Sequence, residues 1–426
     1  MSIMSQLPSK SVIEFSSSNR DAFGLARFGQ SMGVYEHKNL HSRDSSFMRE
    51  KTVAGGTITY KPLESQVELA VGTGATDRAV RETPYTPYIS GNAQRIAPTV
   101  VLAPAKVNNG SRIGYFNDND GAFFERNEAD IRVVIRSSVS GAVLDTNFFI
   151  RDQWDDKLDG TGPSRKTVDF TKGFLPIVEI AWQGYVGVRF GVKVDGEPVY
   201  CKTYYHSGDV PFMATPSLPC RYEIYNTGVT SSASSMKECC LTIRSEGGGV
   251  LPGIEWSADN FFSGGALRNV PVATPQFVLA VRMAPTFNGK TNRRLAQLIA
   301  SDLYAETNPA RAIVYHVHSD YSATLNGAGA AATWTALHAD SAIQVSRDIA
   351  SITGGTLHPV HNLKAAVGVG GSTALAQSHP HTLNYHGQIS NNMDATVSEM
   401  FAVYVARTGA AGATDVCAGF DLIEIE

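Results

Sequence analysis

Residues 174–205 read Phe174-Leu-Pro-Ile-Val-Glu-Ile-Ala-Trp182, Gln183-Gly184, Tyr185-Val-Gly-Val-Arg-Phe-Gly-Val-Lys-Val194, Asp195-Gly-Glu-Pro198 and Val199-Tyr-Cys-Lys-Thr-Tyr-Tyr205. Three apolar runs are joined by two short turns. In the second run apolar and other side chains alternate at period two, as in a β-strand. Asp-Gly between two such runs is a strong hairpin signal. The stretch therefore predicts an antiparallel meander.

The two faces of the second run have different chemistry. One face carries Val186, Val188, Phe190, Val192 and Val194. If exposed, these side chains would form a large hydrophobic patch, so a second sheet must cover them. The other face carries Tyr185, Arg189 and Lys193, spaced by two glycines. It holds no plausible catalytic set, and we predict that it packs on another sheet or subunit.

Comparable strand signals recur to the end of the chain. They include Gln276–Arg282, Ala312–His318, Met400–Ala406 and Gly419–Ile425. Residues 292–302 fit a strand or a short helix, and the neighbouring strands favour a strand. Many short strands separated by turn residues are typical of a sandwich or jelly roll. We predict an all-β chain of antiparallel β-sandwich or jelly-roll-like domains with an extended N-terminal arm.

The expected domain organisation follows the turn-rich breaks between these signals. Residues 1–20 are polar and rich in serine, which predicts an arm that docks on a partner. An N-terminal β region is expected over 21–110, a central β-sandwich over 111–250 and a C-terminal β-sandwich or jelly roll over 251–426.

Composition excludes several classes of protein. The 426 residues carry a formal net charge of −4, whereas nucleic-acid-binding domains present a basic footprint. No apolar run approaches the length of a membrane span, and the first residues do not resemble a signal peptide. Five cysteines without metal-type spacing predict buried thiols in a reducing cytoplasm. We expect no nucleic acid, no membrane insertion and no cofactor.

Enzyme motifs are incomplete. In the segment from Gly160 to Thr167, Arg165 replaces the glycine that a phosphate-binding loop requires before its lysine. Neither a nucleophile elbow nor a zinc-protease helix occurs. The aspartates beside Trp154 imitate a sugar-cleaving cleft, but such a cluster is more typical of a solvated turn. From these observations we predict that the chain is not an enzyme.

Histidines are concentrated in the second half of the chain. His316 and His318 are two residues apart, as are His379 and His381. Residues two apart on a strand share a face, so either pair could offer two imidazoles to a metal. Pro380 indicates a loop for the second pair. We interpret these histidines as polar residues on half-exposed strands and loops, and predict no metal; the four remain the candidate ligands.

Stretches between Ala22 and Gly249 resemble a group of tailed-bacteriophage virion proteins that are described as structural. The resemblance rests on Ala22–Arg27, Arg78–Arg81, Arg112–Glu125, Val133–Gly141, Gln153–Ser164, Val188–Gly191, Asp195–Gly196, Tyr200–Cys201, Pro216–Pro219, Arg221–Ile224 and Ser245–Gly248. The order is consistent and covers a little over half of the chain. Leu25 and Arg165 depart from the usual pattern, and the resemblance weakens after about Pro252.

This resemblance implies a structural component of a phage particle, assembled in host cytoplasm and located in the virion. A tail role as sheath, collar, baseplate or fibre anchor is expected, acting by symmetric self-assembly with copies of itself and other virion proteins. One alternative is a capsid decoration or head-fibre protein. Another is a receptor protein that binds or cleaves host surface glycan through the loop of Trp154 or the His-rich loops. The family has no known catalytic residues to transfer.

Overall fold

The computed structural model describes residues 20–23, 31–43, 48–247, 253–261, 265–271, 274–318, 321–325, 330–365, 387–408 and 412–425. These residues form antiparallel β-sheets, so the all-β sandwich prediction is confirmed. Residues 1–19 of the predicted arm lie outside the described part. Within that part, no helix has the length and apolar character needed to cross a membrane.

The first sandwich contains an eight-stranded sheet ordered β13-β12-β11-β6-β15-β4-β3, with β1 paired to β15. Its strands are β1 (Met32–Lys38), β3 (Thr57–Lys61), β4 (Gln66–Val71), β6 (Ala93–Val101), β11 (Pro176–Ala181), β12 (Gly187–Val194), β13 (Glu197–Tyr205) and β15 (Ser234–Glu246). The predicted meander is β11-β12-β13. On β12, Val188, Phe190 and Val192 are buried, as their alternation requires.

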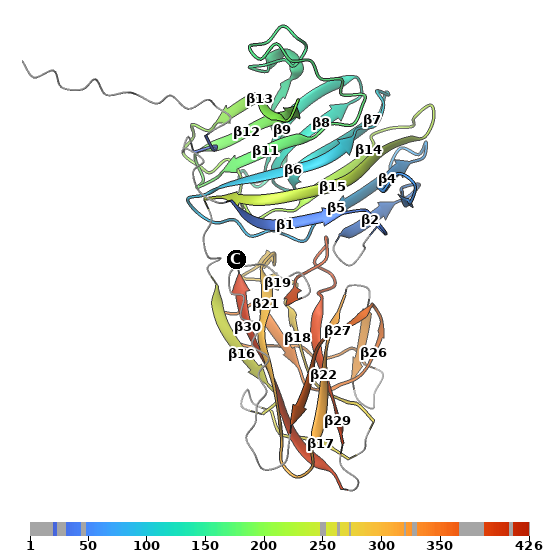
Figure 1. The fold of residues 1–426 in the computed structure, drawn as a ribbon, viewed down its shortest axis with the longest axis vertical. Helices are drawn as coiled ribbons and strands as arrows, with labels where there is room; N and C mark the ends of the chain where they lie inside the picture. The colour runs from blue at the N-terminus through green and yellow to red at the C-terminus, as the bar shows by residue number, and fades with distance from the viewer. Residues whose placement is uncertain are drawn as a thin grey trace, which may run out of the picture.

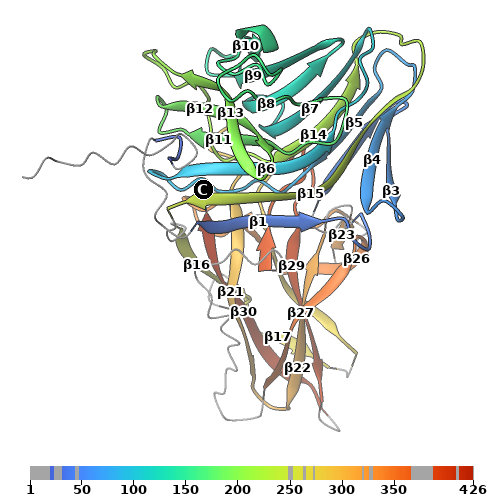
Figure 2. The ribbon, with the colours of Figure 1, turned by 45° about the horizontal axis from the view of Figure 1, so that its top comes forward.

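The opposing sheet has seven strands in the order β10-β9-β8-β7-β14-β5-β2. They are β2 (Arg49–Val53), β5 (Arg78–Glu82), β7 (Asn109–Phe116), β8 (Gly121–Asn127), β9 (Asp130–Ser137), β10 (Leu144–Ile150) and β14 (Cys220–Asn226). Figures 1 and 2 show the two sheets layered face to face.

Strands that precede residue 110 do not form sheets of their own, unlike the separate β region expected for 21–110. Strand β6 lies between β11 and β15, and β5 lies between β14 and β2. The early strands therefore complete both sheets of a single sandwich. Pairing between residues more than a hundred positions apart, as between β6 and β15, leaves no local signal, so the sequence predicted a boundary at residues 110–111 that the fold does not have.

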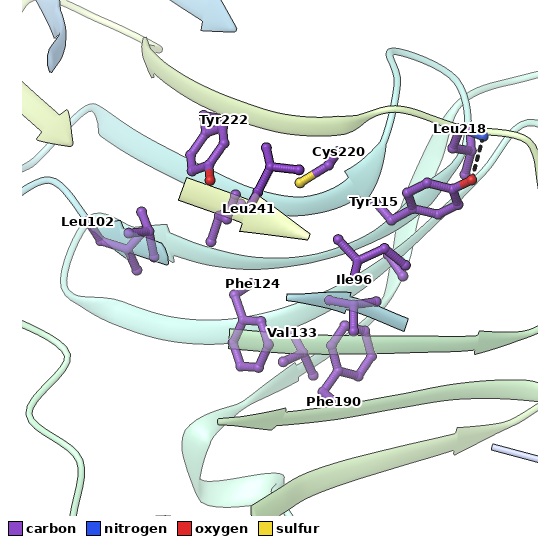
Figure 3. Packing of buried hydrophobic residues seen from close by; sticks show 14 of the residues in the cluster. Ile96, Leu102, Tyr115, Phe124, Val133, Phe190, Leu218, Cys220, Tyr222 and Leu241 are labelled. Atoms are coloured by element: carbon purple, nitrogen blue, oxygen red, sulfur yellow. Dashed lines mark hydrogen bonds between the residues drawn. The ribbon is translucent and has the colours of Figure 1, made fainter. Parts of the chain in front are cut away.

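Large apolar side chains from both sheets fill the space between them (Figure 3). The rings of Phe124 and Phe190 meet edge to face at 5.6 Å between centroids. The Tyr115 hydroxyl accepts a 3.1 Å hydrogen bond from the Leu218 amide, which satisfies a polar group inside the core. Cys201 and Cys220 are buried thiols, as predicted, whereas Cys239, Cys240 and Cys417 are only half-buried.

The second sandwich has its own core and two larger sheets, ordered β16-β30-β21-β28, with β17 on β30, and β24-β25-β18-β29-β22-β27. Its strands are β16 (Ile254–Asp259), β17 (Arg268–Val270), β18 (Gln276–Met283), β21 (Leu295–Ala305), β22 (Ala310–Val317), β24 (Thr335–Ala336), β25 (Ile343–Ser346), β27 (Leu357–Ala365), β28 (Gln388–Ile389), β29 (Met400–Arg407) and β30 (Thr414–Ile425). Two two-stranded sheets pair β19 (Thr286–Phe287) with β20 (Lys290–Thr291) and β23 (Tyr321–Leu325) with β26 (Ile349–Gly354).

One end of the second sandwich contacts the edge of the first near β1 and β2 (Figure 1). Lys51 forms a 2.7 Å ion pair with Asp394 across this junction. The Arg293 guanidinium lies over the Tyr85 ring, 4.6 Å from its centroid. Arg49 of β2 donates a hydrogen bond to the Ser390 hydroxyl. Beside these polar contacts, Met32 and Ile89 of the first sandwich pack against the buried Leu295 and Ile425 of the second, so the junction is both polar and apolar.

Candidate functional site

Charged side chains form a cross-strand row on the outer face of the seven-stranded sheet. On β7, β8 and β14 the inward residues Ile113, Phe124 and Ile224 enter the core, so their neighbours point outward. Arg112 lies opposite both Glu125 and Glu223 in the strand register, and Glu125 lies opposite Arg132. We call this surface the charged face; it comprises Arg78, Glu82, Arg112, Asp118, Glu125, Arg132, Arg136, Asp145, Arg221 and Glu223.

Each central glutamate of the charged face is held between arginines. Arg112 Nε and Arg132 Nε lie 2.6 Å and 2.5 Å from the two carboxylate oxygens of Glu125. Glu223 Oε1 accepts from Arg78 Nε at 3.0 Å and from Arg112 Nη1 at 3.5 Å. Charge-assisted bonds of this kind are strong and directional. The row is therefore a fixed array of donors and acceptors.

An aromatic floor lies beneath these groups. Phe116 and Phe123 are fully buried in a small cluster apart from the main core, with ring centroids 4.5 Å apart. The Arg112 and Arg136 guanidiniums lie 5.4 Å and 5.2 Å from the Phe123 centroid. Arg221 lies 5.5 Å from the Phe116 centroid. Arginine stems and planar heads can cover apolar rings, so the charged layer shields this floor from water.

Mutual charge stabilisation keeps the buried glutamates ionised. Burial alone would raise the pKa of Glu125, but Arg112 and Arg132 hold the pKa below its usual value. The pKa of Glu223 is likewise lowered by Arg112, Arg78 and Arg221 in spite of its burial. Groups with such perturbed pKa values are common at functional sites. Buried ion pairs add little net stability to a fold, so stability alone does not explain this many of them. The charged face is thus a candidate site.

The formal charges of the face cancel, because it holds five arginines and five carboxylates. Its rim is open to solvent at the two ends of the row. Phe148 on β10 is 42% exposed, with the Arg132 guanidinium 4.8 Å from its ring centroid. At the opposite end the side chain of Asp118, which is 57% exposed, accepts from Arg78 and Arg221.

A polar cavity of about 360 Å³ lies at the end of the sandwich. Its lining includes Arg126, Ile150, Arg151, Asp152 and Phe170. Arg126 Nη2 donates to the Phe170 carbonyl at 2.9 Å, and burial lowers the pKa of its guanidinium. The cavity lies at the ends of β8 and β10 and shares no residue with the charged face.

Trp154 was predicted to be part of an interaction surface, and this prediction is wrong. Its side chain is 5% exposed, and its ring packs against Phe124 and Phe170. The indole Nε1 donates to the Phe149 carbonyl at 2.9 Å. The indole ring closes one end of the core, because burying so large an apolar ring is more favourable in free energy than leaving it exposed on a polar loop. Trp154 therefore anchors its loop to the core and does not form part of an exposed binding surface.

The predicted surface of Tyr185, Arg189 and Lys193 is only partly exposed. Tyr185, in the turn before β12, is 48% exposed, and Lys193 is also exposed. Arg189 is 8% exposed, lies 3.5 Å from Glu179, and donates to the Asp21 carbonyl at 2.9 Å. Arg189 is therefore used in contacts within the chain, and packing of this face on another sheet or subunit stays a prediction that rests on Tyr185 and Lys193.

His316 and His318 meet a third group at the end of β22. His318 Nδ1 lies 3.4 Å from Glu399 Oε1, and His316 Nε2 lies 3.9 Å from Glu399 Oε2. Burial alone would raise the pKa of Glu399, but the His318 hydrogen bond and the charges of His316 and Arg49 lower it to about 2. His379 and His381 lie outside the described residues.

Sequence reasoning did not identify the charged face. Its residues were recognised only as parts of strands, although Arg-Val-Val-Ile-Arg and Arg-Tyr-Glu place charges on one side of a strand. Arg78, Arg112, Glu125, Arg136 and Glu223 also lie in stretches that carry the resemblance to virion proteins. Charged residues two or four positions apart on one strand were the signal that the sequence offered. The ion pairs join different strands, and the sequence does not show which strands are neighbours.

No known protein-family model and no curated protein matches the chain. Several solved structures match about half of it. Endo-1,3-beta-glucanase from Streptomyces sioyaensis is 10% identical, with a TM-score of 0.36 over 55% of this chain and 99% of that one. A legume lectin-like domain from Entamoeba histolytica is 11% identical, with a TM-score of 0.30 over 50% and 98%. Endo-beta-1,4-glucuronan lyase from Trichoderma reesei is 10% identical, with a TM-score of 0.33 over 50% and 95%.

These matches concern the fold and assign no reaction to this chain. They correct the prediction that the chain is not an enzyme, because glucanases, a lyase and a transglycosylase are among the structures that it resembles. Missing motifs exclude only the enzymes that use those motifs. The general exclusion of enzymes drawn from the sequence is therefore wrong.

Proposed function

We propose that the chain binds glycan, and that the charged face is where a neutral saccharide lies. The carrying observation is the row Arg132–Glu125–Arg112–Glu223, an ordered, charge-balanced array of donors and acceptors that ends at the exposed ring of Phe148. A saccharide offers hydroxyls that both donate and accept. It also has an apolar C–H face that can contact an aromatic ring.

Preorganisation supports binding at this face. The arginines are already fixed by carboxylates and by the rings beneath them, so little side-chain freedom is lost when a ligand binds. The rim groups of Asp118 and Asp145 are 57% and 29% exposed and retain acceptor capacity for hydroxyls. The Arg132 guanidinium, whose side chain is 19% exposed, offers donors beside Phe148.

Charge balance favours a neutral ligand over a phosphate-rich one. Nucleic acid binds through an excess of lysine and arginine that releases counterions. The charged face has as many carboxylates as arginines, so it provides no such excess. A polar ligand without formal charge meets both kinds of group without a Coulombic penalty.

The resemblance of residues 22–249 to tailed-phage virion proteins supports a particle-borne setting. There the chain would be a receptor protein that attaches the particle to host surface glycan, either from the tail, as first expected, or from the capsid. Copy number measured by mass spectrometry of purified virions tests this setting. A small multiple of the tail symmetry supports a tail position, a number near that of the shell subunit supports the capsid, and absence from the virion contradicts both.

Phe148→Ala and Arg132→Gln are expected to weaken glycan binding about tenfold each, since a lost contact worth about 1.4 kcal/mol changes the dissociation constant by that factor. A glycan array identifies ligands for the wild type, and calorimetry on the best ligand measures the variants. Tyr205→Ala is the matched control, because Tyr205 is an exposed aromatic residue (74%) on the other sheet.

Equal affinity of wild type, Phe148→Ala and Arg132→Gln would contradict the assignment of the face, as would loss of binding in Tyr205→Ala. Release of reducing ends from the bound glycan is measured in the same samples, because it separates binding alone from cleavage.

A further inference from the structure

We propose that His316, His318 and Glu399 form a binding site for one divalent transition-metal ion of the zinc class. One ligand atom from each of the three residues lies within 4.8 Å of the others. The site lies in the second sandwich and shares no residue with the charged face. Zinc binding can therefore be measured without a glycan.

Strand pairing brings the three groups together. Strands β22 and β29 are antiparallel, with Val317 opposite Met400. The residues just past this pair, His318 after β22 and Glu399 before β29, are therefore neighbours. His316 is two residues before His318 and shares its face, and their ring centroids are 4.2 Å apart.

The ligand types suit zinc better than calcium or magnesium. Two imidazole nitrogens and one carboxylate oxygen are a common zinc set that leaves a further position open. The harder ions prefer oxygen ligands alone. His358 on β27 lies opposite His316 in register, and its ring centroid is 5.0 Å from that of His318. His358 is thus a candidate for a fourth ligand.

Burial adds a second observation that points to a ligand. His316 is 2% exposed and the His318 side chain 13% exposed. His318 Nε2 is buried and has no hydrogen-bond partner among the described residues. A buried imidazole nitrogen without a partner calls for an explanation, and an ion bound by the imidazole is one.

Neighbouring groups orient the carboxylate, as outer partners do in metal sites. The Ser390 hydroxyl lies 3.4 Å from Glu399 Oε2 as a hydrogen-bond donor, and Arg49 of the first sandwich donates to that hydroxyl. The positive charge of Arg49 opposes a cation and limits its affinity. Its link to Ser390 places the site at the junction of the two sandwiches. Metal binding would therefore stabilise the second sandwich at this end.

The test uses the full chain without a polyhistidine tag, stripped with chelator and titrated with zinc chloride. We expect one zinc per chain by elemental analysis, a higher midpoint of thermal unfolding, and visible absorption from tetrahedral cobalt when Co²⁺ replaces zinc. His318→Ala and Glu399→Gln should each abolish stoichiometric binding. His41→Ala should bind as the wild type does, because His41 is exposed in the first sandwich.

Circular dichroism checks that each variant keeps its β-structure. Glu399→Gln preserves the size of the side chain, so it decides the outcome if His318→Ala does not fold. Less than half a zinc per wild-type chain would overturn the proposal. So would unchanged zinc stoichiometry and affinity in a folded Glu399→Gln variant.

Discussion

Replacing Glu223 with glutamine is expected to lower the free energy of unfolding by about 3–5 kcal/mol, the usual effect of removing one partner of a buried ion pair. Glu223 is 2% exposed, accepts from Arg78 and Arg112, and lies 3.8 Å from Arg221. Glutamine has nearly the same volume, so the change leaves no cavity. It leaves arginine charges on the face without their shared counter-charge.

The effect should depend on pH with a defined sign. The pKa of Glu223 is lower in the folded chain than in the unfolded one, where it is about 4.3. The stability due to its charge is therefore present above that unfolded value and is lost as pH falls through the lower folded value. The gap between wild type and Glu223→Gln should accordingly narrow below about pH 4.

Urea unfolding at pH 7 and near pH 3 measures both effects. Glu64→Gln is the matched control, because the Glu64 side chain is 48% exposed and pairs with Lys237 on the surface. Its loss should be at most about 1 kcal/mol. Similar losses in both variants, or a gap that does not narrow in acid, would show that the charged face is not an ionised, coupled network.

Trp154→Ala is expected to lower the free energy of unfolding by about 3–5 kcal/mol, as large-to-small changes in a core do. The substitution removes the edge-to-face contacts with Phe124 and Phe170. It also leaves the Phe149 carbonyl without the indole donor. Thermal or urea unfolding of the purified variant measures the loss.

Trp154→Phe is the appropriate comparison, since it keeps most of the apolar volume and removes only the N–H group and one ring. Its loss should be clearly smaller than that of Trp154→Ala. A Trp154→Ala variant with wild-type stability but no glycan binding would instead support the original interpretation of Trp154 as a contact residue.

Local chemistry made the strands and their turns predictable. The alternation in β12 places Val188 and Phe190 in the core because side-chain direction follows directly from the pleat. Asp195 and Gly196 have φ of +52° and +86°, as the two central residues of a tight hairpin turn require. Both features depend on residues within a few positions of one another.

The candidate sites depend on pairings that no local pattern specifies. Arg112 lies between Glu125 and Glu223 because β7 pairs with β8, its neighbour in sequence, and also with β14, more than a hundred residues away. The sequence predicted an accessible Trp154 because the residues of its loop are polar. Only the folded chain shows that the loop returns over the end of the core.

The sequence by itself determined the all-β class, the meander of residues 174–205 and the shared face of His316 and His318, because each follows from the period of two along a strand. The tertiary structure alone decided which strands became neighbours. It thereby placed Glu399 beside the two histidines and assembled the charged face. Register between distant strands is set by the burial of whole sheet faces, which involves residues throughout the chain at once.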